Sequence, residues 1–123
     1  MFVNISNHPS SFWSDIQLGK ARLYGRIVDI PFPTISATAN EESVSSLADE
    51  YAEKIISRFN PKEDVCHVMG ELCFCFILIR RLQEAGFRCV ASTSERMVQE
   101  YEHGYKQVLF DFVRFREYED LNK

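Results

Sequence analysis

The chain has 123 residues, of which 46% are hydrophobic and 26% charged, so its length and composition are typical of one globular domain and exclude a disordered chain. Fourteen basic and eighteen acidic residues give a formal net charge of -4, which argues against duplex nucleic acid as a partner. A small phosphorylated ligand stays open, because a few local groups can bind an anion whatever the net charge.

Targeting and redox signals point to a cytoplasmic protein without membrane contact. No segment has the pattern of a signal peptide, and the longest apolar stretch, Leu72 to Ile79, is much shorter than the roughly twenty residues that cross a bilayer. The cysteines lie in apolar sequence without the spacing of a zinc or redox motif, so we expect reduced core residues. They are Cys66, Cys73, Cys75 and Cys89.

The first part of the chain predicts a strand, a helix and a second strand. The strand covers residues 2 to 6, and Ser14 is placed as the N-cap of a helix from residue 15 to 24. Residues 26 to 30 form the second strand, and the prolines that follow prevent it from being a central one.

The middle of the chain predicts a helix, a strand and another helix. Asn40 caps a helix over residues 41 to 58, whose apolar residues recur at intervals of three and four. Residues 65 to 69 form the third strand, and the helix after it ends at Gly86. The first half of that helix is apolar all round, so we expect both its faces to be covered, the second one by another subunit or by a neighbouring helix.

The last part of the chain predicts two more strands. Residues 87 to 91 form the fourth strand, and residues 94 to 101 form at most a short helix. Residues 105 to 118 alternate as a final strand, which returns antiparallel at the sheet edge or pairs across a dimer. The whole order predicts an α/β fold: a single Rossmann-like, doubly wound domain over residues 1 to 123, with a mostly parallel five-stranded sheet in the order 2-1-3-4-5.

This topology predicts where a ligand site lies. In open α/β sheets ligands bind at the carboxyl ends of the strands, at the switch point, which here falls between strands one and three. The first strand tip carries Asn7, His8, Ser10 and Ser11. His8 could act as a general acid or base, and the serines could bind phosphate or ribose hydroxyls, while loop residues and turn formers are the plain alternative.

The third strand tip supplies Gly70 and Glu71. Glycine between a strand and a helix lets a ligand approach the backbone, and Glu71 could bind a ribose hydroxyl, act as a base or simply favour the helix dipole. The dinucleotide fingerprint G-x-G-x-x-G is absent, which argues against a nicotinamide or flavin enzyme. We therefore expect no cofactor.

The fourth strand tip adds Thr93 and Arg96 as candidate ligand-binding residues, since an arginine can bind phosphate or carboxylate with two hydrogen bonds. A metal site would need His8, Asp29 and Glu71 to converge, and no local spacing supports it. We expect none.

Three segments together resemble a known family: the strand that ends in Asn7-His8-Pro9, the turn Val68-Met69-Gly70-Glu71, and Cys89-Val90-Ala91-Ser92-Thr93. The layout is similar to small, single-domain CRISPR-associated proteins related to CARF domains, several of which are ring nucleases. The resemblance implies a homodimer that binds a cyclic oligoadenylate and cleaves it without metal, by attack of a ribose 2′-hydroxyl on the neighbouring phosphate. It implies that His8 or Glu71 assists proton transfer, that Ser10, Ser11 and the amides after Gly70 hold phosphate, and that Arg96 stabilises charge.

Two other functions remain open. One is a noncatalytic sensor of a nucleotide or another small metabolite, which needs the same pocket without an acid or base. The other is a dimeric interaction protein, whose apolar helix and last strand form an assembly surface while the strand tips are only turns.

Overall fold

The computed structural model describes all 123 residues, and its helices and strands alternate along the chain. The strands are β1 (Phe2–Ser6), β2 (Ile27–Asp29), β3 (Val65–Met69), β4 (Arg88–Glu100) and β5 (Lys106–Glu117). The helices are α1 (Asp15–Arg22), α2 (Glu41–Arg58) and α3 (Leu72–Glu84), with short 3-10 turns η1 (Ser10–Phe12) and η2 (Glu102–Gly104). None of the helices combines the length and the apolar character that crossing a membrane requires.

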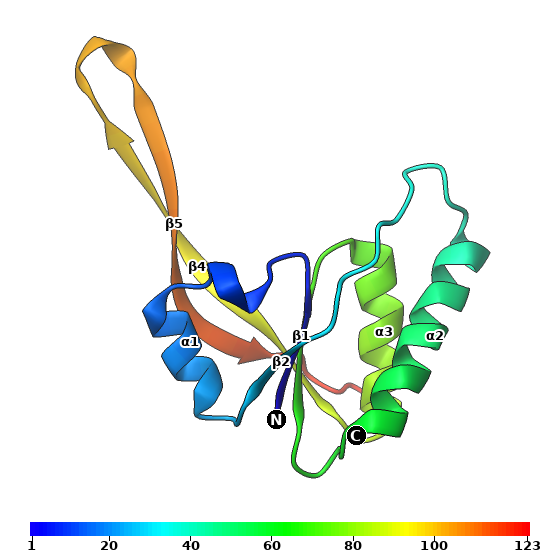
Figure 1. Cartoon of the computed structure of the whole chain (residues 1–123). Coiled ribbons are helices and arrows are strands. Elements are labelled where there is room, and N and C mark those ends of the chain that lie inside the picture. Colours follow the sequence, from blue (N-terminus) through cyan, green and yellow to red (C-terminus); the bar gives the residue numbers. More distant parts are fainter.

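The five strands form one sheet in the order β2-β1-β3-β4-β5, which confirms the predicted topology. The first four pair in parallel, and β5 returns antiparallel to β4 within the same chain. Figure 1 shows α2 and α3 side by side on one face of the sheet and α1 on the other. The carboxyl ends of β1 and β3 therefore meet at one edge, as the switch-point argument requires.

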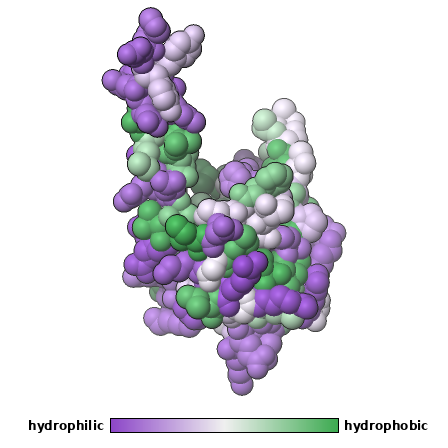
Figure 2. All heavy atoms as spheres, turned by 60° about the vertical axis from the view of Figure 1, so that its left-hand side comes forward, coloured by the Kyte–Doolittle hydropathy of each residue, from purple (hydrophilic) through white to green (hydrophobic).

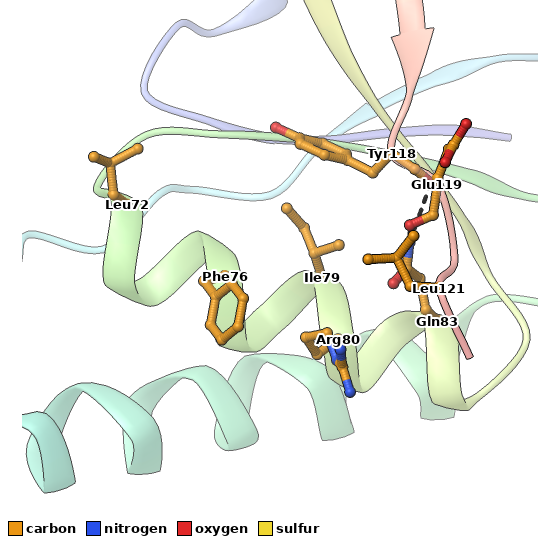
Figure 3. A pocket seen from close by; sticks show the side chains of 8 residues that line it. All are labelled: Leu72, Phe76, Ile79, Arg80, Gln83, Tyr118, Glu119 and Leu121. Carbon is orange, nitrogen blue, oxygen red and sulfur yellow. Dashed lines mark hydrogen bonds between the residues drawn. The ribbon is translucent and has the colours of Figure 1, made fainter.

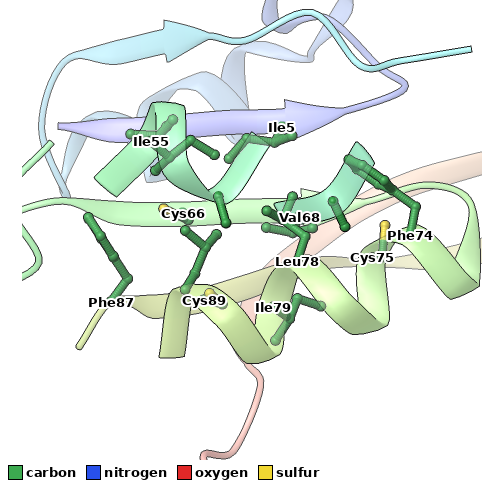
Figure 4. Close-up of a cluster of buried hydrophobic side chains, with 14 of the residues drawn as sticks. Ile5, Ile55, Cys66, Val68, Phe74, Cys75, Leu78, Ile79, Phe87 and Cys89 are labelled. Atoms are coloured by element: carbon green, nitrogen blue, oxygen red, sulfur yellow. The ribbon is translucent and has the colours of Figure 1, made fainter. Parts of the chain in front are cut away.

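Strand alternation divides the core between the two faces of the sheet. Val3 and Ile5 of β1 belong to a cluster of sixteen buried residues under α2 and α3, part of which Figure 4 shows. Phe2, which points to the opposite face of the strand, belongs to a smaller cluster on the α1 side, with Trp13 and Phe115. A strand that is buried on both faces has no solvent side, so any polar side chain within it needs a partner inside the protein.

Predicted caps begin the first two helices. The Ser14 side chain accepts from the backbone N–H of Gln17 at 3.2 Å, and Asn40 Oδ1 accepts from that of Ser43 at 2.8 Å. These bonds satisfy backbone donors that the first helical turn leaves free.

The region after Ser94 corrects one prediction. No helix forms over residues 94 to 101, because β4 continues to Glu100 and pairs with β5 from Val90 to Glu100. Beyond a register shift between Thr93 and Ser94, the two strands leave the body as a two-stranded ribbon. We call this ribbon, residues 94 to 112, the arm; Figure 1 shows it projecting from the body.

The apolar half of α3 is covered on one face only. Phe74 and Leu78 are fully buried, whereas Leu72 and Phe76 are 84% and 67% exposed. No neighbouring helix of this chain covers these two side chains, so that alternative is wrong, and coverage by another subunit stays a prediction. All four cysteines are free, and Cys73, on the same helix, is exposed where we expected a core residue.

Candidate functional site

Three polar side chains lie side by side in the sheet beneath the tip of β1. The strand register sets Asn4 of β1 beside Asp29 of β2 on one flank and beside His67 of β3 on the other. Asn4 is 1% exposed and His67 is 2% exposed. Two buried polar residues in otherwise apolar strands must be paired within the protein.

Asn4 uses all of its hydrogen-bonding capacity. Its Nδ2 donates to Asp29 Oδ1 at 2.8 Å and to the His8 carbonyl at 3.1 Å. Its Oδ1 accepts from Ser6 Oγ at 2.8 Å and lies 2.9 Å from His67 Nδ1. Because an amide oxygen can only accept, Nδ1 of His67 carries the proton and Nε2 carries a lone pair.

His67 stands in an aromatic box and is neutral near pH 7. Its ring centroid lies 5.8 Å from that of Phe2, 5.3 Å from that of Trp13 and 5.4 Å from that of Phe115. Burial, together with the nearby charge of His8, lowers the pKa of His67 to about 4. Its Nε2 is buried without a hydrogen-bond partner. The ring therefore orients Asn4 and does not titrate in the neutral range.

The network fixes the backbone at His8. Asn4 Nδ2 and Trp13 Nε1 each donate to the His8 carbonyl at 3.1 Å, and the Ser6 hydroxyl lies 3.0 Å from it. The backbone N–H of His8 donates to Ser6 Oγ at 3.2 Å. The imidazole of His8 is nevertheless exposed. An exposed histidine on an immobilised backbone is what a binding or acid–base group needs.

Asp29 holds the next part of the same loop. Its carboxylate accepts from the Ser10 backbone N–H at 3.1 Å and from Ser10 Oγ at 2.6 Å. Burial alone would raise the pKa of Asp29, but the hydrogen bonds from Ser10 and Asn4 lower it below the ordinary value. The Ser10 hydroxyl thus fixes the loop, whereas Asn7 and Ser11 are exposed and their side chains make no hydrogen bond within the chain.

Gly70 and Glu71 have structural partners at the tip of β3. A Cβ on Gly70 would lie 2.3 Å from the ring of Phe32, and the Gly70 φ of +156° also favours glycine. The close approach that the glycine permits is therefore made by the segment after β2. The Glu71 carboxylate caps α3, accepting from the backbone N–H groups of Cys73 and Phe74, both at 2.9 Å.

Thr93 and Arg96 do not end a strand, because β4 continues through them. Thr93 Oγ1 donates to the Arg114 carbonyl at 3.1 Å and accepts from its N–H at 3.2 Å, beside the register shift. Arg96 pairs with Phe110 on the arm. The structure thus brings together Asn7, His8, Ser10 and Ser11 and leaves Arg96 outside the site. No group of three His, Cys, Asp or Glu side chains is arranged to hold a metal ion.

Two cavities lie along α3, away from the first strand tip. The first, of about 600 Å³, opens between α3 and the C-terminal segment (Figure 3). Its lining residues are Leu72, Phe76, Ile79, Arg80, Gln83, Tyr118, Glu119 and Leu121. The second, of about 720 Å³, lies between residues 35 to 44 and the start of α3, where Glu71, Leu72 and Phe76 contribute to its wall.

Sequence reasoning missed the network that supports the site. Asn4 and His67 each interrupt an apolar strand, and Asp29 is the last residue of β2, followed by Ile30. The signal was present as one polar residue within each of three apolar runs of the sequence. Recognising it requires the register, which sets the three residues in one row.

The comparison with protein families identifies the group to which the chain is related. The model of the family described as "Uncharacterized protein MJ1673 family" matches residues 1–116. The chain belongs to this family. Neither a curated protein nor a solved structure matches the chain. The family's match covers the β1 tip, the polar row beneath it and the whole arm.

Proposed function

We propose that this protein binds a small nucleotide ligand at the carboxyl edge of its sheet, with Asn7, His8 and Ser11 as the contacting side chains. The observation that carries the proposal is the fixed backbone at His8, whose carbonyl accepts hydrogen bonds from the side chains of Asn4 and Trp13. A surface turn gains little from such support. A ligand site needs it, because preorganised groups lose less entropy on binding.

The surroundings of the β1 tip support the same proposal. Figure 2 shows the molecule hollowed between the arm and the opposite projection. That projection is the segment between β2 and α2, which Figure 1 places at the same edge as the arm. Phe32, in this segment, covers Gly70 and walls the edge on the side of α3. Aromatic and polar groups at a concave switch point suit a base and its phosphate or ribose oxygens.

Cleavage of the ligand is a second candidate function, and the exposure of His8 favours it. In this reaction the imidazole takes the proton of a ribose 2′-hydroxyl, whose oxygen attacks the adjacent phosphorus. The bond from phosphorus to the 5′ oxygen breaks, and that oxygen receives a proton from the imidazolium. The products are a 2′,3′-cyclic phosphate and a 5′-hydroxyl. A cyclic oligoadenylate, the substrate that the resemblance to CARF-related proteins implies, has both the ribose 2′-hydroxyl and the adjacent phosphate.

Glu71 has a weaker claim to a catalytic role than His8. Its two carboxylate oxygens are each bonded to a backbone N–H of α3, so they are turned to the helix. We therefore assign the proton transfer to His8 and a structural role to Glu71.

Binding and cleavage can be tested together on the full chain without added metal. Thermal stability and product formation are followed with a panel of linear and cyclic oligoadenylates. We expect one member to raise Tm, because a ligand that binds only the folded state stabilises it. His8→Ala should abolish the shift and any cleavage without unfolding the loop, since the network holds the His8 backbone and not its ring.

His103→Asn is the matched control, because His103 is an exposed histidine at the far end of the arm. It should leave binding unchanged. A shift without product would support the sensor over the nuclease. If no nucleotide changes Tm or is cleaved, the proposal fails.

A further inference from the structure

The arm has an uncovered apolar face that continues outward from the body. Phe112, at its base, packs against Phe115 on the α1 side with ring centroids 4.8 Å apart. Strand alternation puts Val98, Val108 and Phe110 on that face, and they are 50%, 42% and 67% exposed. A two-stranded ribbon is marginally stable in water unless a face is covered. This face would therefore gain stability from a partner.

Cross-strand residue pairs form successive layers on this face of the arm. Its central layer pairs Val98 with Val108, and we call this pair the valine layer. Toward the body, the neighbouring layer on the same face pairs Arg96 with Phe110; toward the tip, it pairs Glu100 with Lys106. The two layers that flank the valines thus complement each other: Arg96 is opposite in charge to Glu100, and the Phe110 ring can accept the Lys106 cation.

We propose that two copies of this chain associate by stacking these arm faces antiparallel, with the two-fold axis through the valine layer. The axis lies between the two stacked faces and runs perpendicular to the strands. Rotation about it reverses the strand direction and places β4 over β4 and β5 over β5 of the other copy. Arg96 then meets Glu100 of the partner subunit, and Phe110 meets Lys106 of the partner subunit. The first contact is an ion pair and the second a cation–π contact, and each is made twice.

The charged side chains of this face have few partners within their own chain, so they are available for these contacts. The Arg96 guanidinium makes no hydrogen bond or ion pair within the chain, and the Glu100 carboxylate has only an exposed pairing with Lys106 at 3.6 Å. The opposite face of the arm is less suited to burial. There Glu95 lies directly opposite Asp111, so two like charges would be desolvated together.

Antiparallel stacking also brings the tip of each arm close to the body of the other subunit. Since the axis passes through the valine layer, the hairpin turn at residues 102 to 104 reaches the level of Ser94 of the partner subunit, where that arm joins its body. This inference is independent of the proposed ligand site, because it rests on the arm face alone.

Sedimentation velocity of the full chain over a range of concentrations tests the proposal. We expect a reversible dimer, and Val98→Glu should raise its dissociation constant by at least about a hundredfold, because two carboxylates would face each other at the axis. Met97→Glu is the matched control: Met97 is also 50% exposed but lies on the opposite face, so its dimer should persist. Circular dichroism of both variants checks that the body stays folded.

A charge exchange tests the register of the stack. Arg96→Glu and Glu100→Arg should each weaken the dimer by about tenfold or more, and the double variant should return to within about threefold of the natural chain. The proposal is overturned if the chain stays monomeric at every concentration, or if Val98→Glu and Met97→Glu have equal effects. Dissociation by Phe76→Glu but not by Val98→Glu would also overturn it, because the interface would then be the exposed face of α3.

Discussion

Stability between neutral and mildly acidic pH should depend on His67. The folded protein holds this imidazole neutral, with a pKa lowered to about 4 by burial and by the charge of His8, whereas the unfolded chain has the ordinary value of 6.5. The stabilisation is therefore fully present above pH 6.5 and is lost as the pH falls toward 4. At about 1.4 kcal/mol per pH unit, the interval corresponds to a loss of about 3 kcal/mol.

His67→Phe isolates this contribution. A phenyl ring suits the aromatic box of Phe2, Trp13 and Phe115 and cannot titrate. At neutral pH the variant loses one hydrogen bond, of about 1 kcal/mol, and also removes a buried acceptor without a partner, so we expect a net change below about 1 kcal/mol. Below pH 6.5 its free energy of unfolding should fall much less than that of the natural chain.

Urea unfolding at several pH values, followed by circular dichroism, measures the difference. Burial alone would raise the pKa values of Asp29 and Asp64, but their hydrogen bonds lower both below the ordinary value, so these carboxyls act at lower pH than the window assigned to His67. His103→Asn serves as the control, because His103 is exposed and has a φ of +70°, which asparagine tolerates. If the natural chain and His67→Phe lose stability in parallel between pH 6.5 and 4, the reasoning from a buried neutral imidazole is refuted.

Three further predictions concern the β3 tip and α3. Gly70→Ala should lower the free energy of unfolding in urea by about 2 to 4 kcal/mol, because the new Cβ would clash with the Phe32 ring. In the double variant, Phe32→Ala should remove most of this loss, and additive losses would contradict the clash. Glu71→Ala should lower the free energy of unfolding by about 1 kcal/mol, because a helix cap is lost, and should leave nucleotide binding intact. Loss of binding at unchanged stability would instead show that Glu71 contacts the ligand. A thiol reagent should modify Cys73 rapidly and the other three cysteines only on unfolding, since these are buried and burial raises their pKa values; fast reaction of more than one thiol would refute this.

The sheet could be predicted from the sequence because its signals are local. Apolar strands alternate with capped helices, and right-handed crossovers leave few ways to order parallel strands. The Ser14 and Asn40 caps were predictable for the same reason, since an N-cap side chain bonds to the backbone three residues later.

The arm could not be predicted in the same way. Residues 94 to 101 include Glu95, Arg96 and Met97, which favour a helix in isolation, and Ser94 resembles an N-cap. Pairing with β5 decides the conformation instead, and it depends on residues that follow later in the chain. The roles of Thr93 and Arg96 changed with it, because neither residue ends a strand.

The topology that positions the candidate site was predictable, whereas the buried residues beneath it were not. Topology alone places the tips of β1 and β3 at one edge, and the side chains of Asn7, His8 and Ser11 do face solvent there. Whether a polar side chain at a tip is free or already bonded depends on atomic distances. Ser10 and Glu71 are both bonded within the chain, to Asp29 and to α3.

The buried network argues that the β1 tip is more than a connection. Burying Asn4, Ser6 and His67 stabilises the fold less than apolar residues of similar size would, and His67 Nε2 is left without a partner. The bonds from Ser6 and His67 orient the Asn4 amide, which with Trp13 donates to the carbonyl of His8. An apolar row would keep the sheet and release the loop, so what the polar row adds is a fixed position for an exposed imidazole at the edge where α/β sheets bind ligands.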